Sequence, residues 1–411
     1  MLALTLLTCL LGNYVNNGIE ECYPFSRGTG MNKSIQDLLA NANKFVSELS
    51  KPFVGREEEA RVIALSIISG EHVVLIGEPG TAKSALARRA AELINARFFK
   101  YLLTRFTEPD ELFGPLDITA LKQGRYVRIT RNKLPEAEIA FIDEIFNANS
   151  AILNMFLTIM NERIVYDGYN EIKVPLWTMI AASNNVPDEP ELQALYDRFL
   201  YRHFVKPVGE DKWSELIEAA WKIEAGFYEA AEPVLNMDDI RRLNKLLFEV
   251  NLEPIKEKLI RLYAIFEDQG IHITDRRKGK ALKAIAASAL LDQRLIAKEE
   301  DLFVLKHVTP RDMDEMEQAN AILLDEIKAT EKHLRELAEI ESNAREAKKY
   351  IKGITDFDPR LVDYLRSFEA VRERVRKIAE ETSDDVVRQR ALDVLSEINE
   401  VIDMVRRKFM L

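Results

Sequence analysis

A short polar segment near residue 80 has the residue types that bind a triphosphate. It reads Gly77-Glu78-Pro79-Gly80-Thr81-Ala82-Lys83-Ser84, follows the apolar run at 72–76 and precedes a helical stretch that starts at residue 85. A loop between a strand and a helix can turn its backbone N–H groups toward an anion at the helix N-terminus. Lys83 would reach the β- and γ-phosphates, and the Ser84 hydroxyl would bind Mg²⁺. We therefore expect ATP and Mg²⁺ as the ligands of residues 77–84.

This segment departs from the usual phosphate-loop pattern at one position. Ala82 stands where the pattern has glycine. Alanine keeps its backbone N–H and fits any position with negative φ. We expect the loop to keep its phosphate-binding chemistry with Ala82 in such a conformation.

A second motif supplies two carboxylates. The apolar run at 139–142 ends in Asp143 and Glu144, as a buried parallel strand would end at the edge of a sheet. At that edge Asp143 would hold Mg²⁺ through its water shell, and Glu144 would polarise the water that attacks the γ-phosphate. Proteins with a glycine loop that only bind nucleotide or switch often lack the second acid, so this pair favours hydrolysis.

Two asparagines follow another apolar run. Asn184 and Asn185 come after residues 178–182, and a side-chain amide there would orient the attacking water or contact the γ-phosphate. An isolated pair of this kind more often forms a turn. Beside the carboxylate strand we assign the role to Asn184, with Asn185 as the alternative.

Several arginines could act on a phosphoryl group. Arg198 ends a helical stretch after the asparagine strand, and from there it could project to the triphosphate of a neighbouring subunit and stabilise the transition state. Arg202 and Arg163 compete for this role, and a surface ion pair is the plain alternative. Arg276, at the start of a later helix, would reach back over the nucleotide and report its state by moving that helical region.

The elements that position these residues follow from the alternation of apolar runs and amphipathic helices, which predicts an α/β domain with a mainly parallel sheet. Two insertions are expected in it. One is a hairpin at 164–174 that turns at Asp167-Gly168, and the other is a segment at 109–131 with a strand-like run at 125–130. The five predicted strands are His72–Ile76, Phe98–Leu103, Ile139–Ile142, Thr178–Ala182 and Tyr201–Val205.

The pattern predicts four regions. They are an unstructured extension or mis-assigned start without function at 1–30, a nucleotide-binding domain at 31–209, an all-α lid domain at 210–310 and a helical region at 311–411. In the last region apolar residues recur three and four apart from Met313 to Leu337. We expect these helices to pack on one another or on the preceding domain, and a dimerising coiled coil is the alternative. The apolar start of the chain is short for a signal or a membrane span, although a signal remains an alternative.

Composition indicates which partners are disfavoured and in which cellular compartment the protein is expected. The net charge of −11 disfavours sequence-independent nucleic-acid binding, and nothing argues for a membrane. The two cysteines, Cys9 and Cys22, form no disulfide framework or zinc spacing, which fits a reducing cytoplasm. The five histidines are scattered without a pair at ligand spacing, so we expect them to be structural or on the surface.

Together these segments resemble the AAA+ ATPases and, within them, the MoxR family, most closely its RavA-type members. The resemblance covers about residues 52–310. It rests on the segments at 77–84, 111–116, 134–145, 151–163, 181–184, 195–199 and 274–277. The family's pattern also accepts alanine at position 82.

This resemblance implies a P-loop AAA+ core with a parallel five-stranded sheet and helices on both faces, then an all-α lid and a C-terminal helical region. It also implies an ATP-driven ring, typically a hexamer, that works as a chaperone or assembly factor on a protein client. A partner with a von Willebrand A (VWA) domain usually accompanies such a ring. RavA-type proteins carry a small β insertion beyond position 309, whereas this chain reads as helices only, so client recognition does not transfer.

Two other functions are compatible with parts of the sequence. A DNA-acting or chelatase-type motor also carries a hairpin like that at 164–174, but here the hairpin offers only Lys173 against Asp167 and Glu171. Enhancer-binding activators are excluded more firmly, because no loop resembling GAFTGA occurs. A nucleotide-gated scaffold that hydrolyses slowly and binds partners through its helical tail is the second alternative.

Overall fold

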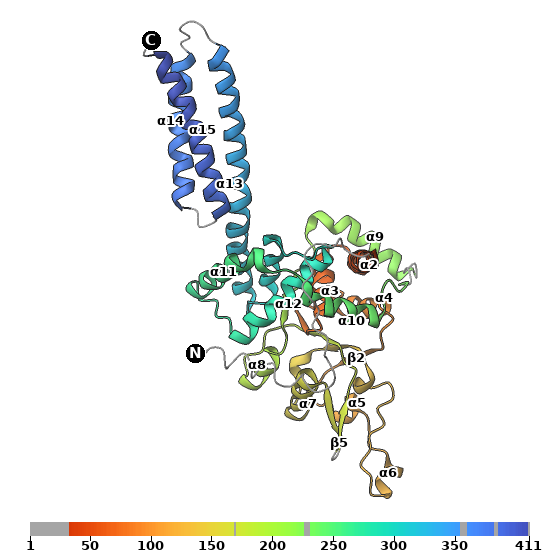
Figure 1. The fold of residues 1–411 in the computed structure, drawn as a ribbon. Coiled ribbons are helices and arrows are strands. Elements are labelled where there is room, and N and C mark those ends of the chain that lie inside the picture. Colours follow the sequence, from red (N-terminus) through yellow and green to blue (C-terminus); the bar gives the residue numbers. More distant parts are fainter. Residues whose placement is uncertain (1–32, 168–169, 226–230, 354–359, 382–384, 410–411) are drawn as a thin grey trace, which may run out of the picture. The chain divides into compact units, whose positions relative to one another are not determined.

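The computed structural model describes residues 33–167, 170–225, 231–353, 360–381 and 385–409 (Figure 1). The described residues from 38 onward belong to one compact unit. The extension expected at 1–30 lies outside the described residues. Among the described residues, no helix has both the length and the apolar character needed to cross a bilayer.

A parallel five-stranded sheet is the centre of the fold. Its strand order is β2–β3–β6–β1–β7. The strands are β1 (Val73–Ile76), β2 (Phe98–Leu102), β3 (Ile139–Asp143), β6 (Thr178–Ser183) and β7 (Tyr201–Phe204). All five predicted strands are confirmed, each to within one residue at its ends. Because the strands are parallel, the residues that follow them meet at one edge of the sheet.

The sheet is covered by helices. Every residue of β1, β6 and β7 is buried, as expected for strands with both faces packed. Helix α3 packs on β1, β6 and β7, and helix α4 packs on β3 and β6. The helices of this part are α2 (Lys33–Ser50), α3 (Glu57–Ser69), α4 (Lys83–Leu93), α7 (Ser150–Glu162) and α8 (Pro190–Tyr196).

The hairpin insertion matches its prediction in both strands. Strand β4 (Ile164–Asp167) pairs antiparallel with β5 (Asn170–Lys173). Asp167 ends β4, and the rest of the predicted turn, residues 168–169, lies outside the described residues.

The other insertion differs from its prediction. It contains two short helices, α5 (Pro109–Phe113) and α6 (Ile118–Lys122). The strand predicted at 125–130 is wrong, because this run makes a single isolated bridge, between Leu116 and Arg128, and no ladder. The Arg128 side chain donates to the Gly114 carbonyl at 2.7 Å, which fixes the run locally.

The next region is helical, as predicted. It contains α9 (Trp213–Glu224), α10 (Met237–Leu246), α11 (Lys256–Asp268), α12 (Asp275–Leu291) and the 3₁₀ segment η6 (Glu299–His307). Helix α12 packs on both α3 and η6.

Three long helices end the chain, namely α13 (Met313–Gly353), α14 (Arg360–Glu381) and α15 (Asp385–Phe409). Figure 1 shows them side by side, and their apolar faces share a core of their own that includes Leu337 and Ile398. At the other end of α13, Met313 and Met316 pack against the core of the α/β domain. The apolar residues of α13 therefore pack within the chain, which is the first of the two arrangements expected for them.

Candidate functional site

The loop at 77–82 begins where β1 ends, at a position that only glycine fits. Gly77 has φ +156°, and a Cβ there would lie 2.5 Å from the Val205 carbonyl oxygen. Its backbone N–H donates to the Ser183 carbonyl at 3.0 Å. The loop is thereby fixed between the ends of β6 and β7.

Ala82 adopts a left-handed conformation, with φ 62° and ψ 15°. The expectation of a negative φ at this position is wrong. A left-handed conformation costs a residue with a Cβ about 1–2 kcal/mol. The loop therefore keeps the backbone path of the glycine that the motif usually has, and alanine holds it at a cost in stability.

Lys83 is folded over its own loop. Its Nζ donates to the carbonyl oxygens of Gly77 at 2.6 Å and Glu78 at 2.8 Å. Burial lowers the pKa of Lys83, and the negative charges of Asp143 and Glu144 oppose this shift. The ammonium group therefore contacts the loop carbonyls and interacts electrostatically with the two carboxylates at the end of β3. Phosphate oxygens could replace the two carbonyls as acceptors.

The other loop residues differ in their exposure to solvent. Glu78, Pro79 and Gly80 are exposed, whereas Thr81 is buried and its hydroxyl donates to the Glu78 carbonyl at 2.9 Å. Ser84 is the second residue of α4, and Asp143 is the last residue of β3. Both are partly buried, so each has solvent access for a hydrated cation.

Glu144 follows β3 in a left-handed conformation, with φ 52°. Burial raises the pKa of its carboxyl, the neighbouring Asp143 raises it further, and Lys83 opposes both. The Asn184 side-chain amide donates to Glu144 Oε1 at 2.9 Å. Asn185 instead contacts the Ser183 hydroxyl through its backbone. Of the two asparagines, Asn184 is therefore the one whose side chain contacts Glu144.

Two of the three candidate arginines are used inside their own chain. Arg202 is 1% exposed, pairs with Asp197 at 2.6 Å and lies 4.0 Å from the ring centroid of Tyr196. Arg163 donates to the Trp177 carbonyl at 3.1 Å and contacts His72 Nε2 at 2.8 Å. Both guanidinium groups therefore fix local structure.

Arg198 differs from these two. It is partly exposed, and its Nη1 makes only a long contact of 3.4 Å to the Ala194 carbonyl. Its Nε, like that of Arg202, is buried and has no hydrogen-bond partner among the described residues. Of the three candidates, Arg198 therefore has the most donor capacity left for an outside acceptor.

Arg198 lines a cavity of about 250 Å³ together with Arg276, Arg277 and Lys280. One acid, Asp197, is among the other lining residues. Burial lowers the pKa of Arg277 to about 9, and this side chain donates to the Val308 carbonyl at 2.7 Å. The excess of cationic groups makes the cavity suitable for an anion.

Sequence reasoning missed two of these cavity residues. Lys280 lies four residues after Arg276 on α12, the spacing that places two side chains on one helix face, so a signal was present. Arg277 follows Arg276 directly in the sequence. Its burial depends on carbonyl groups of residues 197–200 and 308, which no local pattern shows.

Two family models match the chain. One is described as the MoxR domain in the MoxR-vWA-beta-propeller ternary systems and matches residues 40–245. The other is described as an AAA lid domain and matches residues 251–323.

The chain is also similar to individual proteins. Two uncharacterised proteins of Methanocaldococcus jannaschii are 36% identical over 89% of this chain and 95% of their own length, and 42% identical over 66% and 72%. Chaperone MoxR1 of Mycobacterium tuberculosis is 24% identical over 49% of this chain and 52% of its own length. The crystal structure of a suspected ATPase from Cytophaga hutchinsonii has a TM-score of 0.59 at 18% identity, covering 72% of this chain and 96% of that one, which shows the shared fold.

Proposed function

Because this chain belongs to the MoxR family of AAA+ ATPases, we propose that it hydrolyses ATP with Mg²⁺ at sites shared between adjoining protomers of a ring. The observation that carries this proposal is the hydrogen bond between Asn184 and Glu144, which lie at the ends of β6 and β3 beside the loop that holds Lys83. A base, a residue that restrains it and a phosphate-binding cation are thus gathered at one edge of the sheet.

Each residue of this group has a distinct role in the proposal. The loop at 77–84 binds the triphosphate, and Lys83 turns from its own carbonyls to the β- and γ-phosphates. Ser84 and Asp143 hold the Mg²⁺ ion. Glu144 takes the proton of the attacking water, and its raised pKa strengthens it as a base. Asn184 keeps the Glu144 carboxylate in place before the water attacks.

The neighbouring protomer supplies arginine to this pocket. Arg198 and Arg276 line one cavity, so we propose that both reach the same triphosphate, the one held by the adjoining protomer. This replaces the role over its own chain's nucleotide that the sequence suggested for Arg276. The internal contacts of Arg202 and Arg163 favour Arg198 over these two alternatives. A hexamer is the ring size that we expect from the family.

The ring would remodel or mature a partner complex. The matched family is described by systems that also contain vWA and beta-propeller components, and we propose a VWA-domain protein as the partner of this chain. Apolar side chains exposed near the two insertions, such as Phe106 at 91% and Tyr166 at 53%, could contact a protein client. A scaffold that hydrolyses ATP slowly is the second candidate, because the C-terminal helices form a core of their own.

Nucleotide binding and turnover of two variants test the hydrolysis proposal. Lys83→Ala should lose most of its ATP affinity, measured by titration with a fluorescent ATP analogue. Glu144→Gln should bind the analogue as the wild type does and hydrolyse ATP at least about 100-fold more slowly. Glu138→Gln, at the opposite end of β3, is the matched control and should keep turnover. Unchanged affinity in Lys83→Ala would overturn the assignment of the loop.

The partner proposal needs a separate experiment. Glu144→Gln should hold the ATP-bound ring, so affinity purification of this variant from its native cell should recover a VWA-domain protein in an ATP-dependent manner. Addition of that partner to the wild type should raise ATP turnover. Recovery of no such protein, together with slow turnover under all conditions, would favour the scaffold.

A further inference from the structure

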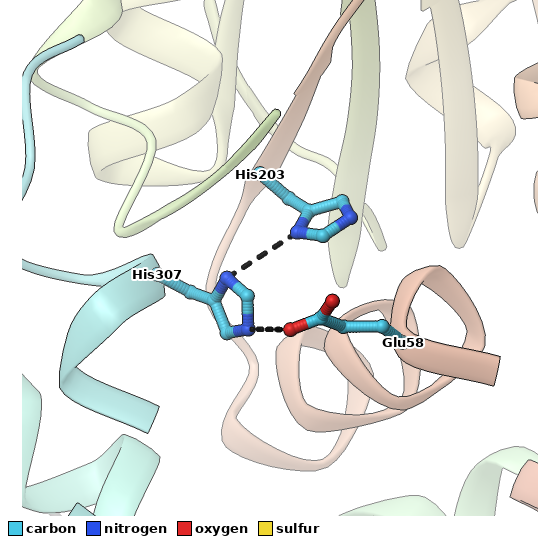
Figure 2. Close-up of side chains that lie close together, drawn as sticks. All are labelled: Glu58, His203 and His307. Carbon is cyan, nitrogen blue, oxygen red and sulfur yellow. Dashed lines mark hydrogen bonds and ion pairs between the residues drawn. The ribbon is translucent and has the colours of Figure 1, made fainter. Parts of the chain in front are cut away.

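Two histidines that are far apart in the sequence face each other in the fold. His203 lies on β7 and His307 ends η6, and their Nδ1 atoms are 3.3 Å apart (Figure 2). Both side chains are buried. The two histidines are 104 residues apart in the sequence, so their spacing gave no sign of a pair, yet the fold brings them into contact.

Two carboxylates stand behind this pair, both in the first turn of α3. Glu58 Oε1 lies 3.3 Å from His307 Nε2, and Glu59 Oε1 lies 3.6 Å from His203 Nε2. Each imidazole thus has the other histidine at one nitrogen and a carboxylate at the other. For His203 this is the arrangement of a metal-binding histidine, because a carboxylate at the second ring nitrogen, here Glu59, orients the ring and makes it a better ligand.

The distances agree with a metal site. Zinc binds imidazole nitrogen at about 2.0–2.1 Å, so two nitrogens on one tetrahedral ion are about 3.3–3.4 Å apart. The two Nδ1 atoms already have this separation. Glu58, His203 and His307 each offer a ligand atom, all within 4.8 Å of one another. For all three ligand atoms to bind one ion, the Glu58 side chain must move. It can do so because it is half exposed.

We propose that His203, His307 and Glu58 bind a divalent transition-metal ion of the zinc type, with Glu59 orienting His203. Imidazole together with carboxylate favours zinc, cobalt or nickel over magnesium. The ion is therefore distinct from the Mg²⁺ that accompanies ATP.

A neighbouring cavity gives the ion a way in. Its volume is about 400 Å³, and Glu58, His203 and Lys306 are among its lining residues. Lys306 pairs with Glu58 in the structure. When Glu58 turns to the metal, the Lys306 ammonium moves into this cavity, where water can solvate it. Water can also complete the coordination of the ion from this side.

The site would join separate parts of the fold. Glu58 belongs to α3 and His203 to β7, both in the α/β domain, whereas His307 belongs to the helical region that follows it. A bound ion would therefore restrain the helical region against the α/β domain. It stabilises the folded chain through free energy of binding that the unfolded chain lacks. This site does not depend on the proposed ATP hydrolysis.

Cobalt titration of the full chain tests the proposal. After treatment with a chelator, the protein should take up one Co²⁺ per chain and show the visible absorption of a tetrahedral ion. Zn²⁺ should displace it, and excess Mg²⁺ should not. Zn²⁺ should also raise the melting temperature of the nucleotide-free protein, a readout that is separate from ATP turnover.

Three variants and one control locate the ion. His203→Gln and His307→Gln should each weaken Co²⁺ binding at least about 100-fold, and Glu58→Gln about 10- to 100-fold. Glu58→Gln changes a half-exposed side chain without altering its size, so it tests the site even where a buried histidine variant fails to fold. His272→Gln is the matched control, because His272 has a carboxylate neighbour, Glu267, at 2.8 Å. It should bind Co²⁺ as the wild type does.

Three results would overturn the proposal. The first is Co²⁺ binding that stays unchanged in Glu58→Gln and in whichever histidine variants fold. The second is an intense thiolate-to-cobalt absorption, lost in Cys9→Ser or Cys22→Ser, which would place the ion on the cysteines instead. The third is the absence of a tetrahedral spectrum in the wild type at stoichiometric Co²⁺.

Discussion

Asn184 donates a hydrogen bond of 2.9 Å from its side-chain amide to Glu144 Oε1. The bond connects the residue that follows β6 with the residue that follows β3, two neighbouring strands of the sheet. It holds the carboxylate while the backbone of Glu144 is in a left-handed conformation. The orientation of the proposed base therefore depends on a second strand as well as on its own.

Removal of this hydrogen bond should slow hydrolysis more than it weakens ATP binding. We expect Asn184→Ala to lower kcat about 100-fold, the effect of removing one positioned donor from an active site. The dissociation constant for ATP should change little, because Lys83 and the loop remain. Asn185→Ala is the matched control, since Asn185 contacts Ser183 through its backbone. Equal losses in the two variants would contradict a specific role for Asn184.

The pH dependence of turnover should report the Glu144 carboxyl. Burial and the charge of Asp143 raise its pKa, and the base must be deprotonated to accept a proton from water. We expect kcat to fall as the pH drops through this raised pKa and to level off above it. Asn184→Ala removes a donor to the anionic form, so its acid limb should move to higher pH. An acid limb at the same pH in both proteins would disagree with this assignment.

Mixed rings should reveal whether Arg198 acts across a protomer interface. Arg198→Ala alone should lower kcat by about 10³ to 10⁵. Rings that mix it with Glu144→Gln should regain turnover, because some interfaces then combine an intact Arg198 with an intact Glu144. Arg376→Ala is the control, since Arg376 makes an exposed pair with Glu380 on α14. Mixtures that stay inactive at every ratio would place the role of Arg198 within its own chain.

Opposite stability changes are expected from the same substitution at two nearby positions. Ala82→Gly should raise the free energy of unfolding by about 1 kcal/mol, because glycine adopts the left-handed conformation of Ala82 without a penalty. Ala85→Gly, in the first turn of α4, should lower it by about 0.5–1 kcal/mol, since glycine weakens a helix. Chemical denaturation of both variants gives the two values. A loss of stability in Ala82→Gly would show that Ala82 is not strained.

The strands could be predicted because their pattern is local. Val73–Ile76, for example, is a continuous apolar run, as a buried parallel strand should be, and the polar His72 and Gly77 mark its two ends. The run at 125–130 has a strand-like composition, yet it lacks a neighbouring strand and makes one bridge to Leu116. Pairing depends on what lies beside a segment in space, so composition alone could not exclude it.

The residues of the candidate site could be predicted from the sequence, but their conformations could be predicted only in part. Lys83, Asp143, Glu144 and Asn184 stand out as polar residues after apolar runs, and the fold brings them together. Separating Arg198 from Arg202 required the contact of Arg202 with the Pro310 carbonyl, 108 residues away. The backbone of Ala82 and the pairing of His203 with His307 likewise depend on contacts that the order of residues does not contain.

Helix α13 runs without interruption from Met313, which packs against the core of the α/β domain, to Gly353, beyond the start of the C-terminal core at Leu337. At about 1.5 Å per residue, its 41 residues make a rod of about 60 Å. A tilt of about 5° at one end of such a rod displaces the other end by about 5 Å. A small rotation of the α/β domain at Met313 would therefore be converted into a displacement of several ångströms at the Gly353 end of α13.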